Sequence, residues 1–190
     1  MTKQLVLVGG GHAHLMTLLQ IPVFRDKGYG VTLVSPSPQH YYSGMGPGML
    51  AGTYRPEQVR FPVREMAEAG GGKFLQDAVV GLDPETRSLR LASGGTLGYD
   101  AVSFNTGSRV DVPGNAALQP DVFTVKPIEN LVAVRKRVLE RLAQGPLSVA
   151  VVGGGAAALE MAGALWRLGR QAKRRPLAVQ VLAGRRFLSH

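Results

Sequence analysis

Residues 4–15 read QLVLVGGGHAHL, and residues 147–160 read LSVAVVGGGAAALE. In each stretch a short apolar run, typical of a buried strand, is followed by three glycines and then by a segment with helical spacing. Both stretches therefore predict a strand, a tight turn and a helix. Because Gly9 and Gly153 stand 144 positions apart, the chain repeats its own plan. The predicted fold class is α/β, with two Rossmann-like dinucleotide-binding folds built on parallel sheets.

The surroundings of the first turn extend this prediction. Gly30–Val34 is a second β-branched run, so the first 35 or so residues are expected to form a right-handed βαβ unit whose helix covers His12 to about Ile21. Residues 35–52, SPSPQHYYSGMGPGMLAG, are rich in Pro and Gly. They are too long for a plain connection, which favours a binding loop.

The middle of the chain predicts a small β-meander and a return to the main sheet. A short helix is expected first, and a basic amphipathic helix follows the return strand. The predicted elements are a helix at Pro62–Ala69, strands at Lys73–Leu82, Ser88–Leu91 and Tyr99–Phe104, a helix at Pro127–Ala143, and strands at Leu147–Val152 and Leu177–Leu182. We expect a first domain at residues 1–112, a linker with its helix at 113–145, and at 146–190 the start of a second, truncated fold.

The first turn has the spacing of a dinucleotide-binding fingerprint. Gly9 would let the backbone bend, and Gly11 would let it approach a pyrophosphate closely. The N–H groups of His12 and Ala13, at the helix start, would hold the phosphates with help from the helix dipole. A purely structural turn is the alternative interpretation.

Two positions depart from the fingerprint. His14 replaces the third glycine, where its imidazole could donate to a phosphate or merely fill space. Ser35 stands where an acid usually bonds the ribose. The second turn fits better, with Gly153, Gly155 and a small Ala158 at the three positions. Its following strand ends without an acid and leads to Arg185 and Arg186, which slightly favours the 2′-phosphate of NADPH over a merely solvated basic turn.

Composition excludes several classes of function. There is no cysteine, so thiol redox chemistry and thiolate metal sites are excluded within these residues. The net charge of +9 comes from basic runs without interleaved aromatic residues, which argues against nucleic acid as a partner. We find no signal-peptide pattern and no apolar run of about 20 residues. The cytoplasm is the expected location, with peripheral membrane attachment left open.

The two fingerprints, joined by residues 99–108 (YDAVSFNTGS), resemble the FAD-dependent pyridine nucleotide-disulfide oxidoreductase superfamily, in particular its type II NADH dehydrogenases. This stretch is similar to a strand that ends in Ala-Thr-Gly, with Asn105 in place of Ala. The resemblance implies that Thr106 and Gly107 lie against FAD and that the backbone of Val79 meets the adenine ring. It also implies that NAD(P)H binds at the second turn.

A narrower resemblance rests on the GGGHAH run at 9–14 and the YSGMGPG run at 42–48. Both resemble NADH dehydrogenase-like flavoproteins found fused or linked to selenide, water dikinase. The resemblance implies that the loop from Pro36, including Tyr42 and Ser43, runs beside the FAD pyrophosphate and isoalloxazine. It further implies that the chain is an N-terminal fragment, whose missing C-terminal part would mediate dimerisation or membrane contact.

The implied activity is hydride transfer from NAD(P)H to FAD, and onward transfer to an acceptor such as a quinone. Glu160 matches a family position that faces the nicotinamide and the flavin, while an exposed helix glutamate that supports a nearby arginine is the alternative. His40 is expected either near the flavin ring or simply on the surface. The competing functions are a non-catalytic FAD- or nucleotide-binding module and an inactive fragment.

Overall fold

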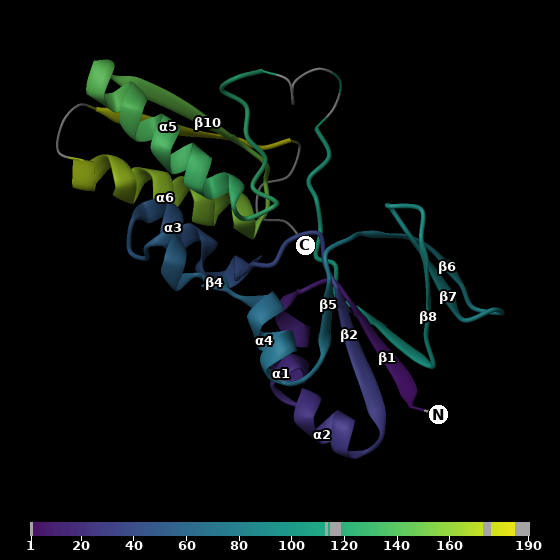
Figure 1. Ribbon diagram of the computed structural model, residues 1–190. Helices are drawn as coiled ribbons and strands as arrows, with labels where there is room; N and C mark the ends of the chain where they lie inside the picture. The colour runs from purple at the N-terminus through teal and green to yellow at the C-terminus, as the bar shows by residue number, and fades with distance from the viewer. Residues whose placement is uncertain (1, 113, 115–118, 173–175, 185–190) are drawn as a thin grey trace. The chain divides into compact units, whose positions relative to one another are not determined.

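The computed structural model describes residues 2–112, 114, 119–172 and 176–184. By the contacts among its residues, the chain divides into two compact units, shown in Figure 1. The first unit comprises Met1–Tyr42 and Arg60–Ser108, and the second comprises Ser43–Val59 and Arg109–His190. The segment Ser43–Val59 therefore groups with residues that begin fifty positions after its end. The linear division near residues 112 and 145 stays a prediction.

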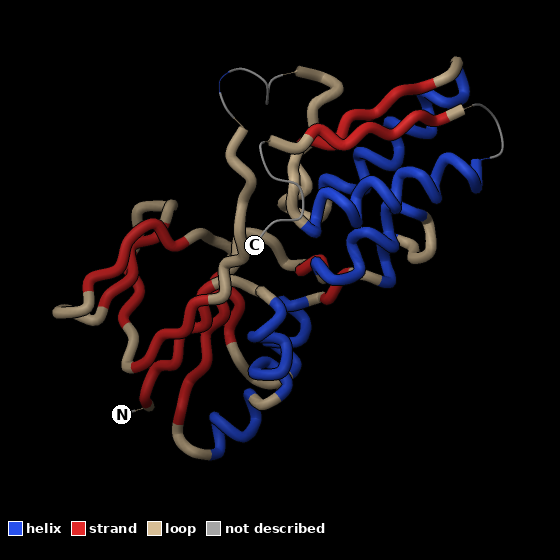
Figure 2. The backbone as a smooth tube through the Cα atoms, turned by 180° about the vertical axis from the view of Figure 1, so that it is seen from behind, coloured by secondary structure: helices blue, strands red, loops and turns tan. Residues whose placement is uncertain are grey.

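The first unit is built on a parallel sheet with the strand order β5-β2-β1-β9. Helices α1, α2 and α4 lie on one face of this sheet, as Figure 2 shows. The elements are β1 (Lys3–Val8), α1 (His12–Leu19), α2 (Ile21–Asp26), β2 (Tyr29–Val34), α4 (Val63–Ala69), β5 (Lys73–Leu75) and β9 (Ala101–Phe104). The predicted βαβ unit is confirmed, except that its crossover holds two short helices rather than one.

The alternation of side chains along the strands divides the core of this unit into two layers. Leu7, Leu33 and Val31 face the helices and pack with the apolar residues of α1 and α4. Val6 and Val34 face the other side, where Leu89 of the meander covers them. Strands buried on both faces explain the continuous apolar runs in the sequence.

The meander is confirmed, but one of its predicted strands is wrong. Lys73–Leu82 is two strands, because β5 pairs with β2 in the main sheet and the chain then leaves that sheet for the meander. The break lies at Asp77, whose carboxylate accepts hydrogen bonds from the Ala78 N–H at 2.7 Å and the Ser93 hydroxyl at 2.5 Å. The meander strands are β6 (Val79–Asp83), β7 (Ser88–Leu91) and β8 (Thr96–Gly98), and a short separate pair joins β3 (His40–Tyr41) to β4 (Arg60–Phe61).

The second unit packs helices against a parallel pair of strands. Within the part of the chain that the structure describes, its sheet contains β10 and β11. The elements are η1 (Ser43–Met45), α3 (Gly46–Ala51), η2 (Pro56–Gln58), α5 (Asn130–Gln144), β10 (Leu147–Val152), α6 (Ala156–Ala172) and β11 (Leu177–Leu182). The predicted bounds of both strands are confirmed.

Helix α3 was not expected in the Pro- and Gly-rich residues 35–52. Its Met49 and Leu50 are fully buried, and a Cβ added to Gly46 would lie 3.1 Å from a Leu131 methyl of α5. At its C-terminal end, the Arg135 guanidinium donates a hydrogen bond to the Leu50 carbonyl at 3.1 Å. Tertiary packing therefore makes a helix from a sequence whose composition is typical of a loop.

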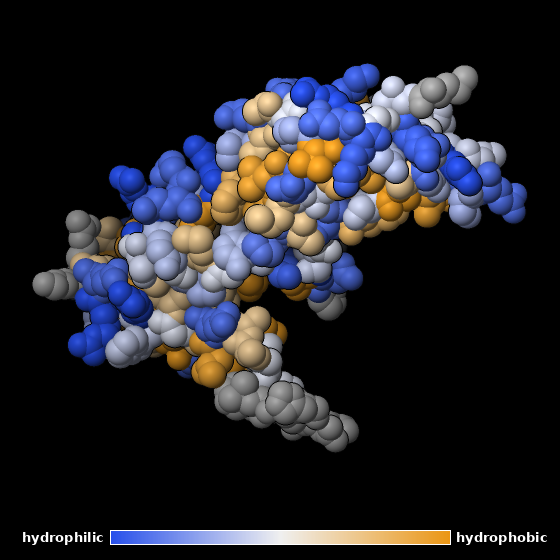
Figure 3. All heavy atoms as spheres, turned by 90° about the horizontal axis from the view of Figure 1, so that it is seen from below, coloured by the Kyte–Doolittle hydropathy of each residue, from blue (hydrophilic) through white to orange (hydrophobic). Residues whose placement is uncertain are grey.

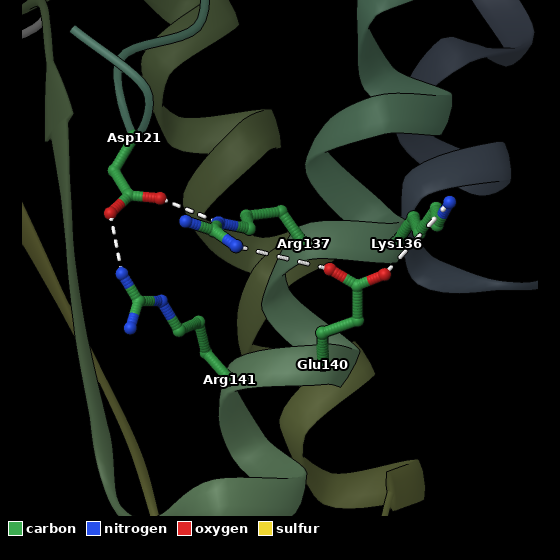
Figure 4. A network of polar contacts seen from close by, with 5 residues as sticks. All are labelled: Asp121, Lys136, Arg137, Glu140 and Arg141. Carbon is green, nitrogen blue, oxygen red and sulfur yellow. Dashed lines mark hydrogen bonds and ion pairs between the residues drawn. The ribbon is translucent and has the colours of Figure 1, made fainter.

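A network of charges fixes the segment before α5 (Figure 4). The Asp121 carboxylate accepts hydrogen bonds from Arg137 at 2.6 Å and Arg141 at 2.8 Å. The bond from Arg137, and next that from Arg141, hold the pKa of the Asp121 carboxyl below its ordinary value of 3.8. Helix α5 begins at Asn130 rather than at Pro127, and the Asn130 amide donates to the Thr124 carbonyl at 3.2 Å.

The surface of the described residues is mixed. Figure 3 shows hydrophilic side chains over most of the face that it presents, interrupted by hydrophobic patches. The exposed apolar residues include Leu19, Val152 and Trp166. None of the described helices combines the length and apolar character that crossing a bilayer requires.

Candidate functional site: two glycine turns

The first glycine turn is held between the ends of two strands. Gly9 has a left-handed φ of +87°, and its N–H donates to the Val34 carbonyl at the end of β2, at 2.8 Å. A Cβ added to Gly9 would collide with the Asn105 carbonyl just beyond β9. The Gly11 N–H donates to the same carbonyl at 3.1 Å. Glycine is therefore required at position 9 by backbone conformation and by close approach together.

The same strand end limits the space at Gly11. A Cβ added there would collide with the Asn105 side chain. The sequence predicts that Gly11 makes room for a pyrophosphate, and this role stays a prediction. The described structure adds a second reason for this glycine, because Asn105 lies beside it.

Helix α1 begins directly after the turn, and no side chain neutralises the partial positive charge of its N-terminus. Gly11 is its N-cap, with φ −64° and ψ 170°, and no side chain caps the helix. There is no acidic residue in the first turn. The N–H groups of His12 and Ala13 have no partner within the helix, as in every first helical turn. Such a helix start attracts anions.

Two of the predicted site residues meet beside this helix start. The rings of His12 and Tyr42 have centroids 4.6 Å apart, with planes tilted by 30°. Tyr42 directly follows β3, so a residue distant in the sequence contacts the first residue of α1. Ser43 opens η1, which groups with the second unit.

Ser35 and Pro36 follow the end of β2. Ser35 is 5% exposed, its N–H donates to the Leu75 carbonyl at 3.1 Å, and its own carbonyl accepts from the Asp77 N–H. Pro36 is exposed. These bonds fix the backbone at the place where the fingerprint expects a ribose.

The end of β9 delivers further predicted residues to the turn. Because β9 is parallel to β1, the residues after both strands lie at the same edge of the sheet. Thr106 and Gly107 are exposed there, and Gly107 has a φ of +77°. Val79 begins β6, half-buried against the core layer between sheet and meander.

His14 does more than fill space, whereas a direct bond from its ring to a phosphate stays a prediction. His14 is 3% exposed, and its Nδ1 lies 2.7 Å from the Gly9 carbonyl while its Nε2 lies 2.9 Å from the Ser103 hydroxyl. Sequence reasoning missed Ser103 altogether. A polar residue within an apolar return strand was the available signal.

The second turn is simpler. Gly153 has a φ of +148°, and its N–H donates to the Leu182 carbonyl at the end of β11, at 3.0 Å. A Cβ added to Gly153 would lie 3.3 Å from the Ala158 methyl, whereas one added to Gly155 would meet nothing within 4 Å. A small residue at 158 therefore lets helix and turn approach closely.

Glu160 lies on α6 one turn after its start and is exposed. Among the described residues it forms no ion pair, so the alternative role of supporting a nearby arginine has no observed partner. Its catalytic role stays a prediction.

Arg185 and Arg186 lie outside the described residues. His40 is half-buried in β3, and the described residues include no group of three or more side chains that would bind a metal ion.

Comparisons with known proteins identify relatives of this chain. The family profile described as pyridine nucleotide-disulphide oxidoreductase matches residues 3–188. The "Probable NADH dehydrogenase" of Dictyostelium discoideum is 21% identical over 176 residues, which are 83% of this chain and 38% of that protein. The "5,5'-dehydrodivanillate O-demethylase ferredoxin reductase subunit" of Sphingobium sp. is 30% identical over 172 residues, which are 87% of this chain and 40% of that protein.

The fold is also that of solved structures. NDH2 from Plasmodium falciparum in complex with NADH superposes with a TM-score of 0.76 and 18% identity, covering 94% of this chain and 42% of that one. At this identity the likeness supports the fold alone. The chain spans about two fifths of the length of these relatives.

Proposed function

Because the chain belongs to the pyridine nucleotide-disulphide oxidoreductase family, we propose that it forms part of an FAD-dependent enzyme that passes hydride from NAD(P)H to FAD and on to an acceptor. The observation that carries this proposal is the pair of glycine turns. Each turn opens a helix at the carboxyl ends of parallel strands, and each helix start lacks an acidic residue. Such helix starts are suited to bind the pyrophosphates of two dinucleotides.

The first turn is the proposed FAD site. The N–H groups of His12 and Ala13 would bind the pyrophosphate, and the rings of His12 and Tyr42 would flank it on one side. When bound, FAD supplies a ring system that accepts hydride and passes electrons on. The residues proposed to hold FAD are Gly9, Gly11, His12, Ala13, Ser35, Pro36, Tyr42, Ser43, Val79, Thr106 and Gly107.

The second turn is the proposed NAD(P)H site, formed by Gly153, Gly155 and Ala158. The open space above Gly155 would admit a phosphate close to the backbone. Glu160 would orient the nicotinamide amide or move a proton, since its exposed carboxylate has no ion-pair partner among the described residues. The chain's own part in catalysis is then chiefly positioning.

We propose a quinone or a similar small oxidant as the acceptor. The absence of cysteine leaves these residues without a thiol pair to relay electrons. The link to selenide, water dikinase, a homodimer and peripheral membrane contact remain predictions from the resemblance.

An absorbance spectrum tests the proposal. The purified chain is mixed with FAD, freed of excess cofactor, and then titrated with NADPH and NADH without oxygen. We expect a retained flavin band, which bleaches if the chain also positions the nicotinamide. Retention without bleaching would favour the non-catalytic module, and no retained flavin would contradict the FAD site.

The control is a matched pair of glycine substitutions. Gly9→Ala places a methyl against the Asn105 carbonyl, whereas Gly28→Ala places one in open space at a similar φ of +85°. Loss of flavin from Gly9→Ala with retention by Gly28→Ala would locate the cofactor at the first turn.

A further inference from the structure

His14 stands at the third position of the first fingerprint, where a glycine usually allows close packing of helix and strand. It is one of three buried polar residues within the described part of the chain. A buried imidazole must have hydrogen-bond partners, or its burial destabilises the fold. Both of its ring nitrogens have one.

The Gly9 carbonyl determines the tautomer of the neutral ring. The Gly9 carbonyl can only accept, so the Nδ1 at 2.7 Å must carry a proton and donate it. In the neutral ring, Nε2 then has a lone pair and accepts from the Ser103 hydroxyl at 2.9 Å. The hydrogen bond to the Gly9 carbonyl therefore fixes the neutral tautomer of His14.

These bonds connect three segments that form the turn. The ring lies on α1, one partner is the Gly9 carbonyl after β1, and the other is Ser103 on β9. The second turn has no counterpart to this bridge, because Ala158 simply packs 3.3 Å from the position of a Cβ on Gly153. In the first turn, two hydrogen bonds take the place of that small contact.

We propose that His14, as the Nδ1–H tautomer, is a positioning residue that holds the Gly9 turn against β9 in the conformation that binds a pyrophosphate. The inference rests on the proposed function for its ligand, the pyrophosphate of FAD. His14 acts through Gly9 and Ser103 and makes no contact with the cofactor itself.

Nitrogen NMR of the histidine side chains tests the bridge without any cofactor. In the 190-residue chain, we expect the neutral ring of His14 to carry its proton on Nδ1 and none on Nε2. Ser103→Ala should shift the Nε2 resonance and speed amide exchange at Gly11. Ser88→Ala is the matched control. Ser88 is also a strand serine, but its hydroxyl is hydrogen-bonded to the Thr86 hydroxyl at 2.9 Å, in the meander rather than at the glycine turn. An Nε2–H tautomer, or no response to Ser103→Ala, would overturn the inference.

FAD affinity tests the positioning role. His14→Phe fills the space but bonds neither partner, and we expect it to weaken FAD binding about tenfold or more. His14→Asn keeps a donor for the Gly9 carbonyl and should recover part of that loss. Ser103→Ala should weaken binding about fivefold in the natural chain and have no further effect in the His14→Asn chain.

These outcomes separate the two proposals. Equal FAD affinity of all folded variants would overturn the role of His14 and leave the FAD site intact. If the natural chain binds no FAD, the proposed function fails for this chain, and the tautomer and the Gly11 exchange still decide whether His14 holds the turn. Melting temperatures measured without FAD would show that each variant is folded during titration.

Discussion

The two glycine turns make equivalent backbone hydrogen bonds but differ in how the following helix is attached. The Gly9 N–H donates to the strand end at Val34, and the Gly153 N–H donates to the equivalent strand end at Leu182. The first turn also contacts β9 and is bridged by His14, whereas the second depends on the small Ala158. The same spacing of glycines therefore fixes the path of the turn but leaves open how its helix is attached.

The largest effect should come from Gly9→Ala. The left-handed φ costs about 1–2 kcal/mol for alanine, and the collision with the Asn105 backbone raises the loss in unfolding free energy to about 3 kcal/mol or more. Gly28→Ala has the strain without the collision, so it should cost about 1–2 kcal/mol. Urea denaturation measures both. Equal losses of unfolding free energy would mean that the backbone of Asn105, just after β9, does not limit the space at Gly9.

Gly153→Ala should destabilise the chain less than Gly9→Ala. Its φ of +148° is unfavourable for alanine, but the nearest neighbour is a single methyl that can shift. We expect a loss of about 2 kcal/mol in the same urea experiment. A loss as large as that of Gly9→Ala would show that the second turn is more confined than its described neighbours suggest.

Gly155→Ala should separate binding from stability. The added methyl meets nothing within 4 Å, so the unfolding free energy should stay unchanged while NAD(P)H affinity falls about tenfold, or about 1.4 kcal/mol. Fluorescence titration with both nucleotides measures this. Gly163→Ala, equally open but on the exposed middle of α6, is the control and should leave affinity unaltered. Unchanged affinity of Gly155→Ala would argue against a phosphate at this turn.

The smallest effect concerns the segment that precedes α5. Because the folded-state pKa of Asp121 is lowered by Arg137 and Arg141, its stabilising contribution is present above the unfolded pKa and is lost as the pH falls through the folded one. Asp121→Asn should therefore speed amide exchange in residues 119–124 at pH 7. Below pH 3.8, the ordinary value, the difference from the natural chain should shrink. A difference independent of pH would mean that the ion pairs do not fix this segment.

Regular apolar runs made much of the fold predictable. Ser88–Leu91, Leu147–Val152 and Leu177–Leu182 have the predicted bounds, because glycines, prolines or turn residues end each run. Lys73–Leu82 failed for a physical reason. Its break depends on Asp77 bonding to Ser93, sixteen positions away, and no local pattern reveals that bond.

The candidate site was predictable in its glycines and less so in its contacts. Spacing identified Gly9 and Gly153, since a tight turn after a strand needs residues without side chains. The role of His14 depends on Ser103, which lies 89 positions away. Helix α3 was missed because its stability comes from burial of Met49 and Leu50 rather than from helix propensity.

The grouping of Ser43–Val59 with the second unit affects how the protein is made. On the ribosome, α3 emerges well before α5 and α6. Its apolar side chains therefore stay exposed until these helices, which contact α3, have been synthesised. No single cut in the gene would release either unit whole. A shortened gene that begins at Arg109 would encode a second unit whose core lacks Met49 and Leu50, and its product should be prone to aggregation.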